Sequence, residues 1–94
     1  MKMVMIIIDD SKREELEVFL NRSGVVGYTE ISRAAGMGTT GPRLGSRAFP
    51  RTSAVVFSVL DQESMERLKE GIDHFCAACG EKLRMVAWEV ESIR

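Results

Sequence analysis

The chain has 94 residues, of which 45% are hydrophobic and 29% charged, and its formal net charge is −1. This length fits one domain with a single, thin core, and the composition is that of an ordinary soluble globule. The initial run MKMVMIII is too short for a membrane helix and lacks a cleavage site of small residues. We therefore expect a cytoplasmic protein without direct membrane insertion, in which Cys76 and Cys79 are thiols.

Positive charge is concentrated in the middle third of the chain. Residues 31–60 contain no acidic residue and four arginines, which are Arg33, Arg43, Arg47 and Arg51. The segments before and after them are both net negative. Local basicity within an acidic protein favours a small anionic ligand over nucleic acid, which needs a broader basic face.

The first third of the sequence predicts a strand followed by a helix. Lys2–Asp9 is a continuous apolar run rich in β-branched residues, which is typical of a strand. Ser11 and Glu14 have the spacing of a capping box, so we expect Ser11 to be the N-cap of the helix. Gly24 is expected to end this helix in a left-handed backbone conformation.

The remaining sequence predicts three more strands and a second helix. The strands are expected at Val25–Ala35, Thr52–Leu60 and Lys82–Glu91, where β-formers lie between turn signals. Asp61 is expected to cap the second helix, and Gly80 is expected to end it. The apolar stripe of this helix comprises Met65, Leu68, Ile72, Phe75, Cys76 and Cys79.

The βαββαβ order predicts one α+β, ferredoxin-like domain over residues 1–94. Right-handed crossovers would place the first and third strands at the centre of a four-stranded antiparallel sheet, with both helices on one face. The strands are apolar on both faces, as in the first strand, where Met3 and Met5 alternate with Val4 and Ile6. Because two helices cover only one face, we expect self-association to bury the other. The alternative is an open face that stays exposed.

A long segment, GMGTTGPRLGSRAFPR (residues 36–51), joins the second and third strands and has neither a helical nor a strand period. Loops of this length in small domains are usually functional or disordered. Its glycines allow backbone N–H groups to approach a phosphate closely, and its arginines suit phosphate or carboxylate. The alternative interpretation is a flexible, solvated basic loop.

Cys76, Cys79 and the nearby His74 raise the possibility of a metal site. Two thiolates and an imidazole suit Zn²⁺ or Cu(I), but a structural zinc site requires four ligands. Both cysteines lie on the apolar stripe of the second helix, where Cys packs as a small hydrophobic residue. We therefore expect no metal, with a metal-responsive protein as the alternative.

Catalytic motifs are missing from the sequence. It contains no nucleophile elbow, no Ser–His–Asp spacing and no P-loop. Asp9 and Asp10 are adjacent at a strand end and would point to opposite faces, which suits turn and capping residues better than a catalytic pair. An RNA-recognition sheet needs several aromatic side chains on its central strands, and only Phe57 is available. The sequence thus predicts a non-catalytic protein that binds no nucleic acid.

Two segments resemble the P-II signalling proteins. SGVVGYTEISRAAGMG, residues 23–38, resembles the part of that family that leads from the first helix through the second strand into the long T-loop. The matching features are Gly24, the Gly27-Tyr28-Thr29 step, and the glycines at both ends of GMG. More weakly, Gly80-Glu81-Lys82 resembles the phosphate-contacting B-loop. The order of elements matches over nearly the whole chain.

The resemblance implies a regulatory homotrimer whose sheets pack open face to open face. It also implies an adenine nucleotide (ATP, ADP or AMP), or another small anionic metabolite, in the clefts between subunits. The ligand-binding residues would be Gly36, Met37, Gly38, Arg47, Gly80 and Lys82. A T-loop-like segment at 36–51, which lacks a tyrosine, would contact an unknown target protein. Its contacting residues would be Arg43, Leu44, Phe49 and Arg51.

Two other functions stay open at this point. One is a metal-responsive protein that uses His74, Cys76 and Cys79. The other is a ferredoxin-like assembly module that binds no ligand.

Overall fold

The computed structural model describes residues 1–39 and 41–94. Thr40, which belongs to the segment expected to be a loop, lies outside the described residues. The elements in chain order are β1 (Lys2–Asp9), the short 3-10 helix η1 (Asp10–Lys12), α1 (Arg13–Arg22), β2 (Thr29–Ala34), β3 (Gly36–Gly38), β4 (Gly41–Arg43), β5 (Ser53–Leu60), α2 (Gln62–Cys79) and β6 (Leu83–Glu89).

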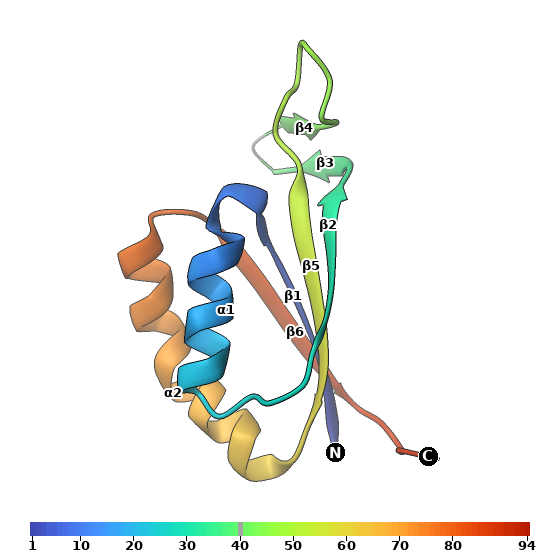
Figure 1. Cartoon of the computed structure of the whole chain (residues 1–94), viewed down its shortest axis with the longest axis vertical. Coiled ribbons are helices and arrows are strands. Elements are labelled where there is room, and N and C mark those ends of the chain that lie inside the picture. The colour runs from blue at the N-terminus through green and yellow to red at the C-terminus, as the bar shows by residue number, and fades with distance from the viewer. Residues whose placement is uncertain (40) are drawn as a thin grey trace.

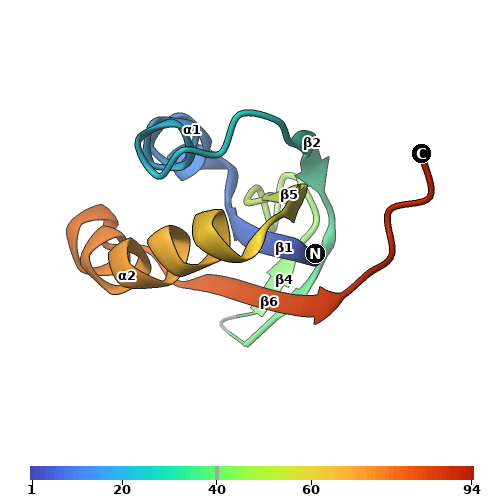
Figure 2. The same cartoon turned by 90° about the horizontal axis from the view of Figure 1, so that it is seen from below.

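Four of the strands form one antiparallel sheet in the order β2-β5-β1-β6, with β1 and β5 at its centre. Both helices cover the same face of this sheet (Figures 1 and 2). The predicted ferredoxin-like architecture and the central position of the first and third long strands are therefore confirmed. The segment after β2 extends beyond one end of the sheet, and both termini lie at the other end (Figure 1).

The core lies between the sheet and the helices. Alternate residues of β1, namely Val4, Ile6 and Ile8, are buried on this side and pack with side chains from β5 and both helices. Leu16 and Leu20 are the buried residues of α1. The buried residues of α2 are Met65, Leu68 and Phe75.

The opposite face of the sheet is also apolar. Met3 lies between Val59 and Trp88 in the register of the three neighbouring strands. Val59 is 41% exposed and Trp88 is 45% exposed. The next row places Met5 between Phe57 and Val86. No helix covers this face within the part of the chain that the structure describes (Figure 2).

The start of the first helix differs from the prediction. Asp9, rather than Ser11, is the N-cap: it caps η1, and its side chain accepts a hydrogen bond from the Ser11 backbone N–H. The 3-10 turn delays α1 until Arg13, and its N-cap Lys12 makes no side-chain capping bond. Ser11 therefore donates to a buried carboxylate instead of capping the helix.

The second strand is shorter than the predicted Val25–Ala35. The N–H of Val25 donates to the Leu20 carbonyl at the end of α1, so this residue completes the helix terminus and packs into the core. Val26 is fully exposed, and the pairing with β5 begins only at Thr29. The first strand has the predicted bounds, Lys2–Asp9. The predicted strand Thr52–Leu60 loses its first residue, and Lys82–Glu91 loses one residue at its start and two at its end.

Residues 36–51 contain local structure that the sequence did not indicate. β3 and β4 pair as a two-stranded ribbon in which Met37 lies opposite Pro42. Beyond the ribbon, the Leu44 and Ser46 N–H groups donate to the Phe49 carbonyl, at 3.3 and 3.0 Å. The N–H of Gly45 donates to the Arg51 carbonyl at 3.3 Å, with a left-handed φ of +65°. A turn of residues 44–51 therefore follows the ribbon.

Candidate functional site

A buried carboxylate at the end of β1 holds the base of the 36–51 segment. Asp9 is 7% exposed and accepts hydrogen bonds from the backbone N–H and hydroxyl of Ser11, at 3.0 and 2.5 Å. Arg43, at the end of β4, donates to the same carboxylate through Nη2. The Arg43 guanidinium also donates to the Ser53 hydroxyl at 2.9 Å and to the Thr52 carbonyl at 3.0 Å. The contacts of Arg43 fix the ribbon to the sheet.

A second arginine connects this carboxylate with the segment after α2. The Nε of Arg51 lies 3.3 Å from Asp9 Oδ1, and its Nη2 donates to Glu81 Oε1 at 2.6 Å. The hydrogen bond to Glu81, followed by the charge of Asp9, raises the pKa of Arg51 above its usual value. Arg51 is therefore a fixed cation that bridges two acidic side chains from different parts of the chain.

The charge state of Asp9 follows from its surroundings. Burial acts to raise its pKa, but the hydrogen bonds from Ser11 and Arg43 and the charge of Arg51 together outweigh burial. The pKa of Asp9 therefore lies below its ordinary value of 3.8. The carboxylate is ionised at neutral pH and neutralises part of the positive charge that the sequence places in this segment.

Asp10 ties the end of β2 to the start of β5. Its Oδ2 accepts from the Arg33 backbone N–H at 2.9 Å and from the Thr52 hydroxyl at 2.5 Å. Arg33 has a left-handed φ of 57° where the register of β2 shifts against β5. An open hollow of ≈ 300 Å³ lies beside these contacts. It is lined by Asp9, Asp10, Ser11, Pro50, Arg51 and Thr52.

The turn beyond the ribbon presents apolar and basic groups to solvent. Leu44 is 51% exposed and Phe49 is 43% exposed. Arg47 is exposed and makes no ion pair with any residue of the described chain. Two of the three arginines of this segment are thus occupied by carboxylates, while Arg47 is not.

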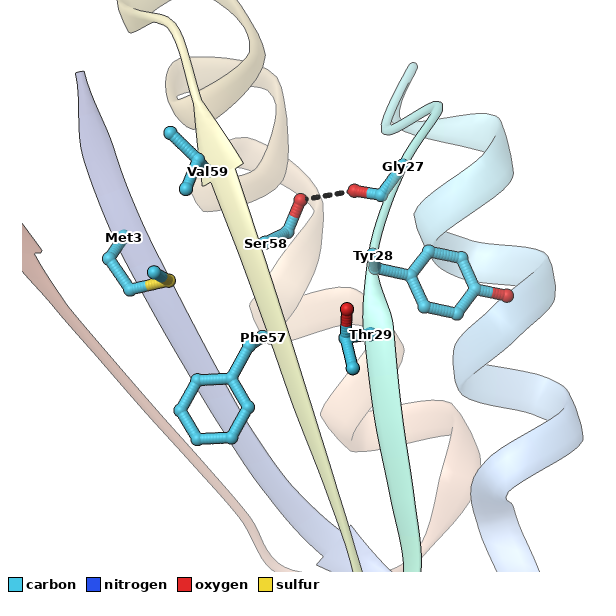
Figure 3. A pocket seen from close by; sticks show the side chains of 7 residues that line it. All are labelled: Met3, Gly27, Tyr28, Thr29, Phe57, Ser58 and Val59. Atoms are coloured by element: carbon cyan, nitrogen blue, oxygen red, sulfur yellow. Dashed lines mark hydrogen bonds between the residues drawn. The ribbon is translucent and has the colours of Figure 1, made fainter. Parts of the chain in front are cut away.

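A shallow pocket of ≈ 230 Å³ lies on the open face of the sheet, where the edge strand β2 meets β5. The Ser58 hydroxyl donates to the Gly27 carbonyl at 2.5 Å and fixes the chain just before β2. Figure 3 shows Tyr28 extending outward past β2, whereas Phe57 projects from β5 on the side of Met3. The pocket is lined by Met3, Gly27, Tyr28, Thr29, Phe57, Ser58 and Val59. The Gly27-Tyr28-Thr29 step therefore contributes to a surface hollow.

The predicted B-loop-like turn directly follows α2. Gly80 has a left-handed φ of +72°, which ends the helix as predicted. Glu81 binds Arg51, and the next residue, Lys82, is exposed. The structure thus brings Arg51, rather than Arg47, to this turn. Gly36 and Met37 of the ribbon are exposed, and Met37 is 76% exposed.

The family described as Nitrogen regulatory protein P-II matches the sequence over residues 1–94. The chain belongs to the P-II family. No curated protein sequence matches it.

Solved structures of PII-like proteins share the fold. CPII from Thiomonas intermedia K12, bound to ADP and bicarbonate, is 25% identical with a TM-score of 0.71, and the match covers 95% of this chain and 86% of that one. CPII bound to ADP, AMP and bicarbonate gives 24% identity, the same TM-score and the same coverage. A PII-like signaling protein from Thermus thermophilus is 16% identical with a TM-score of 0.66, over 95% and 85% of the two chains.

The cysteines of this P-II-family chain lie at the end of α2. Cys79 packs against the core, and Cys76 is half-buried, which raises the pKa of its thiol. His74 is exposed. Within residues 1–39 and 41–94, no group of three or more His, Cys, Asp or Glu side chains is arranged to hold a metal ion. None of the described helices is long and apolar enough to cross a membrane.

Sequence reasoning missed the importance of Asp9, Asp10 and Glu81 as partners of the 36–51 segment. The prediction of turn and capping roles for Asp9 and Asp10 is confirmed in that Asp9 caps η1, but it does not include their contacts with arginines of the middle third. Glu81 is predicted only as part of a B-loop-like turn. The one available signal was the charge asymmetry, because any arginine of this segment that packs against the fold needs a carboxylate from elsewhere in the chain, as Arg43 and Arg51 do.

Proposed function

We propose that this P-II-family protein is a non-catalytic, cytoplasmic regulator that forms a homotrimer and binds an adenine nucleotide between its subunits. The observation that carries the proposal is the apolar open face of the sheet, with the Gly27-Tyr28-Thr29 pocket at its edge. A second subunit packed on this face would bury the apolar rows and deepen the pocket into a cleft.

The extent of the open face supports self-association. Rows of apolar side chains cross it from strand to strand, and exposed members include Ile31, Val59, Val86 and Trp88. Contiguous apolar patches of this kind on soluble proteins usually mark interfaces. A closed trimer would cover each copy of the face with the same face of its neighbours, which leaves none of the three open faces exposed.

The chemistry of the pocket and its surroundings suits a nucleotide. Phe57 and Met3 offer an apolar and aromatic surface for a base. Basic and glycine residues that suit phosphate groups occur on the ribbon and on the turn after α2. The proposed ligand-binding residues remain Gly36, Met37, Gly38, Arg47, Gly80 and Lys82. The PII-like neighbour CPII binds ADP, AMP and bicarbonate, which makes these the first ligands to test.

The 36–51 segment is the proposed contact with a target protein. Leu44 and Phe49 offer exposed apolar side chains at the turn. Arg43 and Arg51 are held by Asp9 and Glu81 in the described conformation. A target that used these two arginines would have to exchange its own acidic groups for those carboxylates.

Calorimetric titration with ADP, AMP and ATP, with and without bicarbonate, tests the proposal. At least one nucleotide is expected to bind at up to one site per subunit. Lys82→Ala should weaken that binding, because it removes a cation from the proposed phosphate site. The matched control is Lys69→Ala, since Lys69 is an exposed lysine of α2 that pairs with Glu66. Absence of binding by all three nucleotides, or equal effects of both substitutions, would contradict the proposed site.

A further inference from the structure

We propose that the Arg51–Glu81 ion pair is an autoinhibitory clasp that holds the 36–51 segment against the turn after α2. In this arrangement Glu81 occupies the guanidinium that an anionic ligand at the Gly80–Lys82 turn would otherwise use. Anion binding opens the clasp and releases the segment. The inference rests on the proposed function and adds an element of regulation to it.

The geometry makes Arg51 the link between the two parts of the site. Its guanidinium reaches Glu81 Oε1 at 2.6 Å and lies 3.3 Å from Asp9 Oδ1. Glu81 comes from the turn that directly follows α2, thirty positions further along the chain. Because the Arg51 side chain contacts both groups, a movement of the turn after α2 displaces the 36–51 segment, and the reverse.

The carboxylates of Asp9 and Glu81 differ in how firmly contacts other than Arg51 hold them. Asp9 is buried, bonded to Ser11 and paired with Arg43, so it is fixed whether or not Arg51 stays. The side chain of Glu81 is 25% exposed, and Arg51 provides its ion pair among the described residues. Glu81 is thus the partner that an incoming phosphate or carboxylate can displace, because such an anion offers a charged acceptor oxygen to the same Nη2 donor of Arg51.

Release of Arg51 would alter the turn of residues 44–51 through its backbone hydrogen bonds. The Arg51 carbonyl accepts from the Gly45 N–H, and the Phe49 carbonyl accepts from Leu44 and Ser46. These bonds are 3.0–3.3 Å long and close the turn upon itself. A shift of Arg51 therefore weakens the backbone hydrogen bonds of residues 44–46. This stretch includes Leu44, a proposed contact with the target.

Glu81→Gln tests the clasp because it removes the charge and keeps the shape of the side chain. Hydrogen exchange without ligand is expected to become faster at residues 44–46. Affinity for inorganic pyrophosphate, a probe of the anion site that needs no adenine pocket, is expected to rise about fivefold or more. Glu91→Gln is the matched control, because it removes the same charge from an exposed residue with no ion pair in the described chain.

A double-mutant cycle separates a clasp from a general structural role. In an Arg51→Gln background, Glu81→Gln should cause no further increase in exchange at residues 44–46, because the ion pair is already lost. Pyrophosphate affinity in that background should stay low and should not respond to Glu81→Gln, because no guanidinium is left to release. Unchanged exchange and affinity in Glu81→Gln, or effects equal to those of Glu91→Gln, would overturn the clasp.

Binding of pyrophosphate and of ADP, measured separately, shows which of the two proposals fails, the clasp or the nucleotide site. If ADP binds but neither the wild type nor Glu81→Gln binds pyrophosphate, the clasp is wrong and the nucleotide proposal survives. If Glu81→Gln binds pyrophosphate more tightly but no nucleotide binds, the clasp stands and the nucleotide proposal is wrong.

Discussion

The carboxylate of Asp9 holds the guanidinium of Arg43, which lies 34 positions further along the chain. One residue ends a central strand, and the other ends the two-stranded ribbon that departs from the sheet. Their contact fixes the base of the 36–51 segment, while the chain between β4 and β5 extends beyond the end of the sheet (Figure 1). The segment is thus anchored at its base and exposed at its turn.

Asp9→Asn is expected to lower the free energy of unfolding by about 2–3 kcal/mol, because hydrogen bonds to a buried charged group contribute about 1.5–3 kcal/mol. Chemical denaturation monitored by circular dichroism measures the change. The control is Asp73→Asn, at an exposed position of α2, which should have little effect. Equal stability of the two variants would show that the Asp9 network does not stabilise the fold.

The depressed pKa of Asp9 predicts a dependence of stability on pH. A carboxyl whose folded pKa lies below its unfolded value stabilises the fold above the unfolded pKa, near 3.8, and loses this contribution as the pH falls through the folded pKa. The difference in unfolding free energy between the wild type and Asp9→Asn should therefore be constant near neutral pH and shrink below about pH 4. A difference that stays constant down to about pH 2 would contradict this assignment.

Gly71 is the position where α1 and α2 approach closely. A Cβ at this residue would lie 2.9 Å from Cε1 of Phe19, whose ring stacks on Phe75 with centroids 4.8 Å apart. Gly71→Ala would ordinarily stabilise a helix interior, but here we expect a loss of about 1–2 kcal/mol from overpacking. Thermal unfolding in the wild type and in a Phe19→Leu background is the measurement. The loss should be smaller in that background, and stabilisation by Gly71→Ala in the wild type would refute the clash.

The sequence predicted the architecture well because hydrophobic patterns report it directly. The run Lys2–Asp9 and the stripe of α2 from Met65 to Cys79 matched the observed elements closely. Asp61 accepts from the Ser64 N–H at 2.8 Å, as expected of an N-cap. These signals are local, so each one can be read without knowledge of the fold.

The contacts of the 36–51 segment could not be predicted in the same way. Which of several acids neutralises Arg43 or Arg51 depends on strand order and on how the chain leaves the sheet. The ribbon of β3 and β4 was not predicted either, because its short, glycine-containing strands show no alternation of apolar and polar residues. The displaced helix start has a similar cause: the Ser11 hydroxyl donates to the Asp9 carboxylate instead of capping the helix, and the fold sets where that carboxylate lies beside Arg43.

The cysteines are expected to behave as partly buried thiols. Burial raises the pKa of Cys76, so less of the reactive thiolate is present near neutral pH. A maleimide should label the native protein slowly and the denatured protein quickly, as followed by mass spectrometry. Replacement of Cys76 and Cys79 by Ala should reduce stability and leave nucleotide binding intact. Tight, stoichiometric Zn²⁺ or Cu(I) binding that this double variant loses would favour a metal-responsive protein instead.

The open face predicts a position-specific effect of charge on assembly. Val86→Glu, on β6 at 37% exposure, should dissociate the proposed trimer because it would bury an unpaired carboxylate between subunits. Val18→Glu makes the same change on α1, at 51% exposure on the helical layer, and should leave assembly unchanged. Light scattering coupled to size exclusion measures both masses. A trimer that tolerates Val86→Glu would indicate that subunits meet elsewhere.

Native mass spectrometry of the wild-type protein with ADP tests the central claim most directly, because it reports assembly and ligand binding together. We predict a species of three times 10.5 kDa that carries up to three ADP molecules, with free subunits as a minor fraction at micromolar concentration. A monomer that binds no ADP would contradict both the trimer and the nucleotide site. A trimer that binds no adenine nucleotide would contradict the proposed ligand and leave an assembly module as the better description.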